Sequence, residues 1–106
     1  MRYLADDEFL RGKVPMTKRE VRILTMAELA AMPGDIVADI GAGTGSLSIE
    51  AARAVGDGTV YAVERNPEAV QLIRENARRF GLSNIVVEEQ EAPAGLEQLP
   101  LLDGAI

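Results

Sequence analysis

Three glycines at alternating positions, Gly41, Gly43 and Gly45, follow the acidic residue Asp39 in the run Asp-Ile-Gly-Ala-Gly-Thr-Gly. Glycine is needed where a backbone must turn sharply and let a ligand approach without a Cβ atom in the way. A helix that begins at Ser46 would point unpaired backbone N–H groups and the positive end of its dipole toward that ligand. The run therefore predicts a ligand-binding loop, whose members are Asp39, Gly41, Ala42, Gly43, Thr44 and Gly45.

The spacing of these glycines separates two classes of nucleotide-type ligand. Dinucleotide-binding folds prefer G-x-G-x-x-G, which would place the third small residue at position 46, whereas here it is Gly45 and Ser46 follows. A carboxylate at Asp39 would also repel a pyrophosphate. It suits a ligand with a cationic group, such as the ammonium and sulfonium of S-adenosylmethionine. The alternative interpretation of Asp39 is that it only caps local backbone N–H groups.

Two further acidic residues stand where strands of a nucleotide-binding sheet would end. Glu64 follows Gly45 by 19 residues, at a strand end where a carboxylate can accept hydrogen bonds from both ribose hydroxyls of an adenosine. Glu91 takes the equivalent position after the next strand, and we expect it to bind the adenine amino group together with the Ala92 backbone. The alternative for Glu91 is a solvated acidic cluster with its carboxylate neighbours.

The elements that must position these residues alternate β-branched runs with helical periods, which is typical of βαβ units and a parallel sheet. Thr17 and Glu20 form a capping-box pattern, and Met16 and Val21 form a hydrophobic staple, so Thr17 should be the N-cap of the first helix. The segment Pro33-Gly34-Asp35 should stop this helix at about residue 32.

The remaining elements follow from short apolar runs bounded by turn residues. Asn66 is a good N-cap and Pro67 the preferred first helical residue, and Gly56 and Gly81 should end two helices. We expect strands at 36–40, 59–64, 85–89 and 103–106, and helices at 46–55, 66–81 and 94–99. The predicted fold class is α/β, a Rossmann-like parallel sheet of about three strands plus the start of a fourth.

The length of 106 residues fits one small domain. Residues 1–34 would hold the amino-terminal segment and the first helix, and residues 35–106 the ligand-binding βαβ region. A strand that stops on Gly-Ala-Ile with no crossover after it would leave apolar surface uncovered. We therefore expect the natural protein to be longer than this chain, or a partner chain to complete it.

Composition excludes several kinds of chemistry. The chain has no cysteine and no histidine, which argues against disulfides, zinc sites and a histidine general base, so we expect no metal. The net charge of −6 disfavours a nucleic-acid partner, and without a long apolar run we expect no membrane span and a cytoplasmic location. Residues 1–22 nevertheless hold six basic groups against four acidic ones, which suits an anionic small substrate or merely a solvated surface.

Five parts of the chain together resemble one enzyme family, the decarboxylating precorrin-6B C15-methyltransferases of cobalamin biosynthesis. They are Phe9, Val14-Pro-Met-Thr-Lys-Arg-Glu-Val-Arg22, the run from Asp39 to Gly45, Glu64-Arg-Asn-Pro-Glu-Ala69 and Glu91-Ala-Pro93. The likeness covers essentially the whole chain. Its segments at 14–18 and 64–69 are fairly specific to that family, whereas the glycine run is shared by most class I S-adenosylmethionine-dependent methyltransferases.

The resemblance implies methyl transfer to C15 of a (cobalt-)precorrin-6B type corrin precursor, with decarboxylation of the C12 acetate, in a homo-oligomer that is usually a tetramer. It also implies a set of residues that bind S-adenosylmethionine: Thr17, Asp39, Gly41, Ala42, Gly43, Thr44, Gly45, Glu64, Arg65, Glu91 and Ala92. Because the substrate is a polycarboxylate, Lys13, Lys18, Arg19 and Arg22 are candidates to bind its acid groups. The resemblance also implies that Pro15 to Thr17 lie near the mouth of the cofactor and substrate site, so Pro15 is a further substrate candidate. The resemblance assigns no catalytic residue.

Three different interpretations stay open from the sequence. An NAD-dependent oxidoreductase shares the strand, the glycine loop and the acidic residue, although the position of Gly45 and the presence of Asp39 count against it. A truncated, non-catalytic module could bind the cofactor or a partner and turn nothing over. A methyltransferase could also act on another small molecule, since the glycine loop does not select the methyl acceptor.

Overall fold

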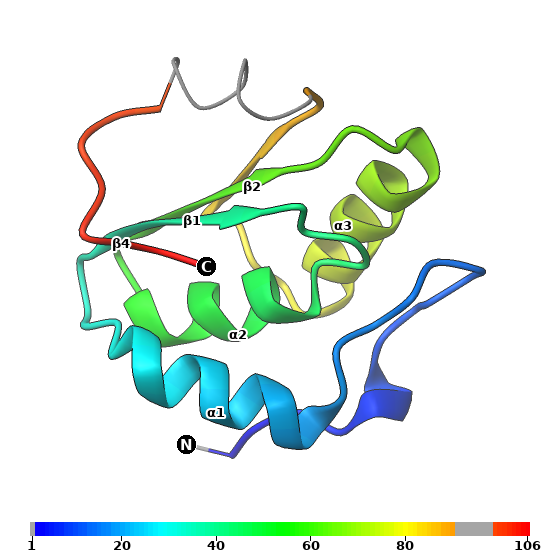
Figure 1. Cartoon of the computed structure of the whole chain (residues 1–106), viewed down its shortest axis with the longest axis horizontal. Helices are drawn as coiled ribbons and strands as arrows, with labels where there is room; N and C mark the ends of the chain where they lie inside the picture. The colour runs from blue at the N-terminus through cyan, green and yellow to red at the C-terminus, as the bar shows by residue number, and fades with distance from the viewer. Residues whose placement is uncertain (1, 91–98) are drawn as a thin grey trace.

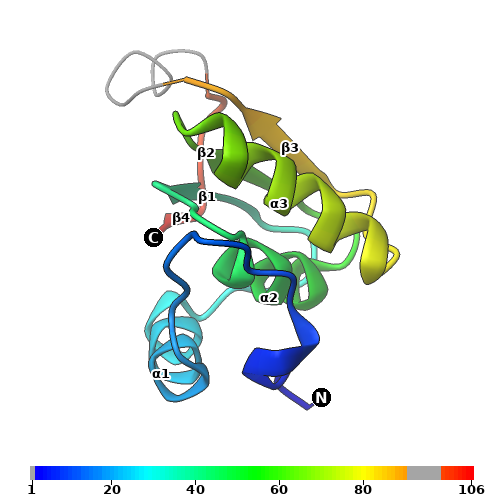
Figure 2. The ribbon, with the colours of Figure 1, turned by 90° about the vertical axis from the view of Figure 1, so that its right-hand side faces the viewer.

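The computed structural model describes residues 2–90 and 99–106, which form an open parallel sheet with helices on one side (Figures 1 and 2). The strands, in the spatial order β3-β2-β1-β4, are β1 (Ile36–Ile40), β2 (Thr59–Val63), β3 (Ile85–Glu88) and β4 (Gly104–Ala105). The helices are α1 (Arg19–Leu29), α2 (Ser46–Val55) and α3 (Pro67–Arg79), preceded by a 3-10 turn, η1 (Asp6–Glu8). The predicted α/β fold class is confirmed.

The main core lies between the sheet and α2. Val37 of β1 and Val60 of β2 pack against Val55 of α2 and Met26 of α1. Each buried valine of this kind contributes about 1.5–3 kcal/mol relative to an exposed one. β1 is an inner strand, paired with β2 on one side and β4 on the other. The sheet therefore fixes the position of Gly41, the residue that follows the carboxyl end of β1.

Several predicted boundaries are confirmed. β1 and α2 have the expected limits, and the helix that follows β2 begins where the Asn66-Pro67 pair indicates. The Oδ1 atom of Asn66 accepts a hydrogen bond from the backbone N–H of Glu68 at 3.0 Å, which satisfies one of the free donors at the helix start. At the other end Gly81 adopts a φ of +66°, the left-handed conformation expected after a helix. β2 and β3 each end one residue earlier than predicted.

The predicted start of the first helix is wrong. α1 begins at Arg19 with Lys18 as its N-cap, and no side chain caps it. The carbonyl oxygen of Thr17 instead accepts a hydrogen bond from the guanidinium of Arg22 at 2.7 Å, which holds Thr17 outside the helix. The staple is wrong as well, because with Lys18 as the N-cap Met16 and Val21 no longer hold the two staple positions, and Val21 is 50% exposed.

The end of α1 also differs from the prediction. The helix stops at Leu29, three residues before the expected position, because Ala30 adopts a left-handed conformation with a φ of +52°. The predicted helix at 94–99 falls almost entirely outside the described residues, and Leu99 is not helical. Among the helices of the described part, none is long and apolar enough to cross a membrane.

The amino-terminal segment runs beside α2 and α3 before it reaches α1 (Figure 2). Leu4 and Phe9 pack against Ile49 of α2, and Val14 packs against Ala69 and Leu72 of α3. The segment is therefore part of the folded domain.

Candidate functional site

The glycine loop, residues 41–45, joins β1 to α2 at the carboxyl end of the sheet. The N–H groups of Gly41 and Ala42 both donate to the carbonyl oxygen of Val63, at 2.8 and 3.1 Å, which bends the loop across the end of β2. Gly41 has a φ of +72°, and a Cβ added there would meet no atom of the described residues within 4 Å. The backbone at Gly41 therefore faces open space, as a ligand cradle requires.

Glu64, the first residue after β2, holds the glycine loop from the side. Its Oε1 accepts a hydrogen bond from the N–H of Gly43 at 2.9 Å, and its Oε2 accepts one from the N–H of Asn66 at 2.9 Å. Each carboxylate oxygen has a second lone pair. The half-buried carboxylate can therefore order the loop and still accept hydrogen bonds from a hydroxyl-bearing ligand beside Gly43.

Asp39, near the end of β1, is almost completely buried at 3% exposure. Its Oδ2 accepts a hydrogen bond from the hydroxyl of Ser48 in α2 at 2.7 Å. Burial raises the pKa of the Asp39 carboxyl and the nearby charge of Glu64 raises it further, whereas hydrogen bonds from the side chain and backbone of Ser48 lower it. The contact with Ser48 matches the local capping interpretation of Asp39, and a contact with a cationic ligand group stays a prediction.

A strap, defined as residues 10–17, runs to the glycine loop from the other side. The carbonyl oxygen of Pro15 lies 3.6 Å from the position of a Cβ on Gly43, and a Cγ of Val14 lies 3.9 Å from it. Residue spacing alone did not indicate this contact, whereas the family resemblance predicts Pro15 to Thr17 near the mouth of the cofactor and substrate site. It brings the basic amino-terminal segment to the edge of the glycine loop.

Comparison with known proteins identifies the family that shares this arrangement. Residues 8–105 match the precorrin methyltransferase domain family, so the match covers nearly the whole chain. The chain belongs to the precorrin methyltransferase family. This match contains the strap, the glycine loop and Glu64.

Relatives of this precorrin methyltransferase domain carry consistent names. A probable cobalt-precorrin-6B C(15)-methyltransferase (decarboxylating) from Sulfolobus acidocaldarius is 46% identical over 91% of this chain and 51% of its own length. The cobalt-precorrin-6B C(15)-methyltransferase (decarboxylating) of Salmonella typhimurium is 47% identical over 85% of this chain and 47% of its own length. The chain thus spans about half the length of the curated relatives it matches.

A solved structure shows the same fold at similar coverage. The crystal structure of precorrin-6y C5,15-methyltransferase from Geobacter metallireducens superposes with a TM-score of 0.91 at 40% identity, over 97% of this chain and 54% of that one. The described sheet and helices are therefore those of the matching half of a precorrin methyltransferase.

The structure brings most of the predicted cofactor residues of this precorrin methyltransferase domain to one end of the sheet. Thr44 is buried, and its carbonyl oxygen accepts a hydrogen bond from Asn76 at 3.1 Å. Arg65 is exposed and adjoins Glu64, and Thr17 is half-buried at the end of the strap. Glu91 and Ala92 lie outside the described residues.

The substrate candidates separate into two groups. Lys13, Pro15 and Lys18 are exposed and Arg19 is half-buried, so their side chains can reach a ligand. Arg22 cannot, because its side chain is fully buried.

Arg22 is instead part of an internal network. Its guanidinium donates to the carbonyl oxygens of Leu4 and Thr17, at 2.6 and 2.7 Å, and to Asp6 at 2.6 Å. It also lies 3.9 Å from Oε2 of Glu50. The prediction that Arg22 binds substrate is wrong, because its side chain is fully buried and both of its terminal nitrogens donate to protein groups.

Among the buried polar residues that were missed from the sequence, two had a signal. Glu50 interrupts the small apolar residues of α2, so a charge there had to find partners inside the protein. Asn76 continues the apolar stripe of α3 at helical spacing after Ala69, Leu72 and Ile73. Both residues bind the amino-terminal segment, Glu50 at the N–H of Leu4 and Asn76 at Leu10.

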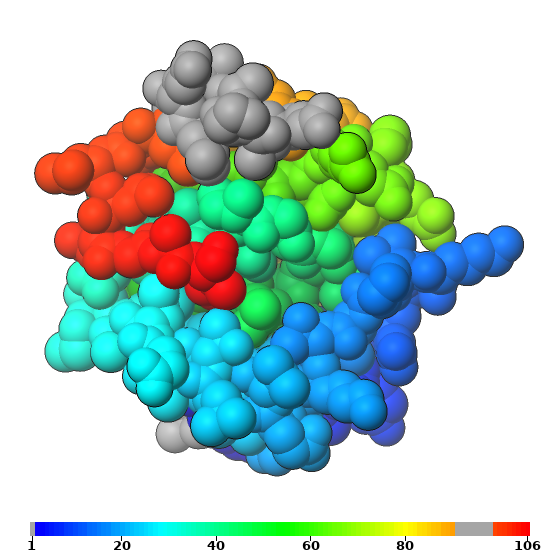
Figure 3. Space-filling view, in the orientation of Figure 1, coloured from blue at the N-terminus to red at the C-terminus, as the bar shows by residue number. Residues whose placement is uncertain are grey.

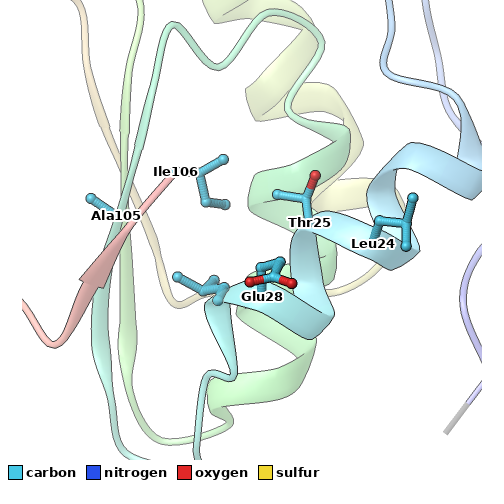
Figure 4. Close-up of a pocket in the computed structure, with 6 residues that line it drawn as sticks. Leu24, Thr25, Glu28, Ala105 and Ile106 are labelled. Atoms are coloured by element: carbon cyan, nitrogen blue, oxygen red, sulfur yellow. The ribbon is translucent and has the colours of Figure 1, made fainter.

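A separate groove of about 370 Å³ lies between α1 and the end of β4 (Figure 3). It is lined by Leu24, Thr25, Glu28, Leu29, Ala105 and Ile106 (Figure 4). Glu28 is the only charged residue among these, so the groove is mainly apolar. None of its lining residues belongs to the glycine loop or the strap.

Replacement of Asp39 by asparagine should raise thermal stability at neutral pH. A carboxyl whose pKa is raised by folding binds its proton more tightly in the folded state than in the unfolded chain. Its stabilising effect is therefore complete below the ordinary value of 3.8 and is lost as the pH rises through the raised pKa. An asparagine at this position would remain uncharged and could still accept the Ser48 hydroxyl.

The measurement is the unfolding midpoint of Asp39→Asn and of the unsubstituted protein between about pH 4 and pH 8. We expect the difference between them to shrink toward the acidic end. Glu89→Gln is the control, because it removes one negative charge from a carboxyl that is exposed rather than buried. A difference for Asp39→Asn that did not vary with pH would contradict the argument.

Proposed function

We propose that this chain binds S-adenosylmethionine at the carboxyl ends of β1 and β2, with the glycine loop along the cofactor and Glu64 at its ribose. The observation that carries the proposal is the double contact of Glu64, whose carboxylate binds the N–H groups of both Gly43 and Asn66. This places a hydrogen-bond acceptor at Gly43 of the loop, two residues after Gly41, where an added Cβ would meet no described atom within 4 Å. The residues present therefore fit an adenosine with free ribose hydroxyls.

We propose further that the chain serves methyl transfer to C15 of a (cobalt-)precorrin-6B type corrin precursor, with decarboxylation of the C12 acetate. This activity is the one named for the relatives, and the family match supports it. The bound cofactor would supply an activated methyl group on its sulfonium. The described residues would hold donor and acceptor in line, which is the main requirement of such a transfer.

The acceptor is an anionic tetrapyrrole in this proposal, and the exposed cations on the strap and just after it would meet its carboxylates. Lys13 and Lys18 are exposed at and just after the strap, and Arg19 begins α1. Charge-assisted hydrogen bonds from such groups are strong and weaken with salt when exposed. We therefore expect the KM for the acceptor to rise with ionic strength, and a KM independent of salt would remove this assignment.

The runner-up function is methyl transfer to another small molecule, because nothing in the glycine loop selects the acceptor. A cofactor-binding module without turnover and an NAD-dependent oxidoreductase rank below it. Three predictions stay open: the roles of Glu91 and Ala92, the homo-oligomer and the cytoplasmic location. Light scattering of the purified protein tests whether it is a tetramer.

The decisive experiment is calorimetric titration of the protein with S-adenosylhomocysteine and, separately, with NAD. We expect S-adenosylhomocysteine alone to bind. Glu64→Gln should raise its Kd about tenfold and Glu64→Ala about 100-fold, because a hydrogen bond to a charged group is worth about 1.5–3 kcal/mol and alanine also frees two backbone donors.

The matched control for this titration is Glu89→Ala, which removes the same charge from an exposed position after β3. Its Kd should stay within about twofold of the original value. Binding of NAD with no binding of S-adenosylhomocysteine would replace the methyltransferase proposal by the oxidoreductase. If Glu64→Ala and Glu89→Ala raised the Kd of S-adenosylhomocysteine equally, the assignment of Glu64 to the ribose would be contradicted.

A further inference from the structure

The strap is held at three points along its length. Its first residue, Leu10, is bound by Asn76 of α3. In the middle, the side chain of Val14 is buried against α3. At the last residue, the carbonyl oxygen of Thr17 accepts a hydrogen bond from the buried guanidinium of Arg22 at 2.7 Å. Between these points Pro15 lies against Gly43, so the position of the strap determines one wall of the glycine loop.

Asn76 is the side chain that joins the strap to the glycine loop. Its Oδ1 accepts the N–H of Leu10 at 2.7 Å, and its Nδ2 donates to the carbonyl oxygens of Leu10 at 2.9 Å and of Thr44 at 3.1 Å. These contacts reach across 66 and 32 residues of sequence. One planar amide therefore fixes the relative position of two segments that are distant in the chain.

The burial of Asn76 makes this role specific. The side chain is fully buried on a helix face that is otherwise apolar. A buried amide must be satisfied at both ends, whereas a leucine would fill the same stripe without that requirement. Only a residue with a donor and an acceptor in one plane can bind the N–H of Leu10 and both carbonyl oxygens.

We propose that Asn76 is a positioning residue of the cofactor site: it holds the strap against the glycine loop, so that the cofactor and the acceptor-binding cations share one preformed wall. Lys13 lies on the strap and Lys18 follows it directly, so a displaced strap would also displace the cations at the acceptor side. The inference rests on the proposed function, because it requires the cofactor to bind in this loop. Asn76 itself touches neither ligand in this account.

The test replaces Asn76 by aspartate, which has nearly the same shape but no amide donor. An ionised carboxylate there would face the carbonyl oxygens of Leu10 and Thr44 and push the strap and loop apart, whereas a protonated one could donate again. We expect Asn76→Asp to raise the Kd of S-adenosylhomocysteine about 10- to 100-fold at about pH 8 and much less at about pH 5. The ratio of the two Kd values at each pH removes any pH dependence of binding that the variant and the unsubstituted protein share.

Val55→Ala is the structural control, because Val55 is fully buried in the core between α2 and the sheet and is no part of the strap. It should lower stability and leave the Kd unchanged at both pH values while the protein is folded. A folded Asn76→Asp protein that bound S-adenosylhomocysteine like the unsubstituted one at about pH 8 would overturn the inference. If the unsubstituted protein did not bind, the proposed function itself would fail, and the inference with it.

Hydrogen exchange on the unsubstituted protein gives a second measurement that needs no variant to fold. Saturating S-adenosylhomocysteine should slow exchange at the amide of Leu10 together with that of Gly45, which donates to Ala42 within the loop at 2.9 Å. Slower exchange at Gly45 with no change at Leu10 would show that the strap is not coupled to the loop, and would also overturn the inference.

Discussion

Arg22→Met should lower the free energy of unfolding by about 3–5 kcal/mol, the loss typical when one partner of a buried ion pair is removed. The substitution keeps most of the volume of a fully buried side chain, so packing changes little. It leaves the carbonyl oxygens of Leu4 and Thr17 unpaired and removes the cation beside Glu50, which is only 1% exposed. Urea denaturation measures the loss.

Two companion variants separate the charge from the packing. Arg53 also binds Glu50, at 2.8 Å, but its side chain is 22% exposed, so Arg53→Met should cost clearly less than Arg22→Met. Adding Glu50→Gln to Arg22→Met should recover at least about 1 kcal/mol, because it removes a buried charge that would otherwise keep only the partly exposed Arg53 as its cation. A loss below about 1 kcal/mol for Arg22→Met alone would show that the network is not a principal anchor of the amino-terminal segment.

Gly45→Ala should destabilise the fold by about 2–4 kcal/mol. The loss has two causes, because the alanine would be strained in a left-handed backbone conformation and its Cβ would be crowded by the core. Gly45 has a φ of +83°, and a Cβ there would lie 3.0 Å from a side-chain carbon of Ile73 and 3.3 Å from its Cα. Ile73 is fully buried in α3, so it has little room to move away. Thermal or urea unfolding measures the effect.

Gly41→Ala is the matched comparison within the same loop. Gly41 shares the positive φ, at +72°, but its Cβ would meet no described atom within 4 Å. Only the backbone strain of about 1–2 kcal/mol should appear in its stability. In the proposed site the added methyl group would occupy the space of the cofactor, so Gly41→Ala should weaken S-adenosylhomocysteine binding more than it weakens the fold. Equal stability losses at the two glycines would contradict the packing role of Gly45.

The sheet and two of its helices could be predicted because their signals are local. The apolar run 36–40 ends at a glycine, and Asn66-Pro67 specifies the start of α3 within the chain itself. The same holds for Glu64, whose position at a strand end followed from the spacing, although its contact with a ribose stays a prediction. Each of these features depends on neighbours a few residues away.

The features that could not be predicted depend on distant partners. Thr17 matches a capping box in sequence, but its carbonyl oxygen is bound by a guanidinium that is fixed in turn by Leu4 and Asp6. Arg22 follows two other basic residues and so looked like part of an exposed cationic surface. No local pattern distinguishes a cation that faces water from one that holds a buried segment in place.

The pairing of β4 with β1 also has a consequence for the nascent chain. The N–H of Ile36 at the start of β1 binds Asp103, 67 residues later in the sequence, and Val37 pairs with Gly104. At ribosomal rates of about 5–20 residues per second, that edge of β1 waits roughly 3–13 seconds for its partner. During this interval an apolar strand with free N–H and C=O groups is open to wrong pairing. A ribosome-associated chaperone that shields short apolar strands should therefore raise the yield of folded protein.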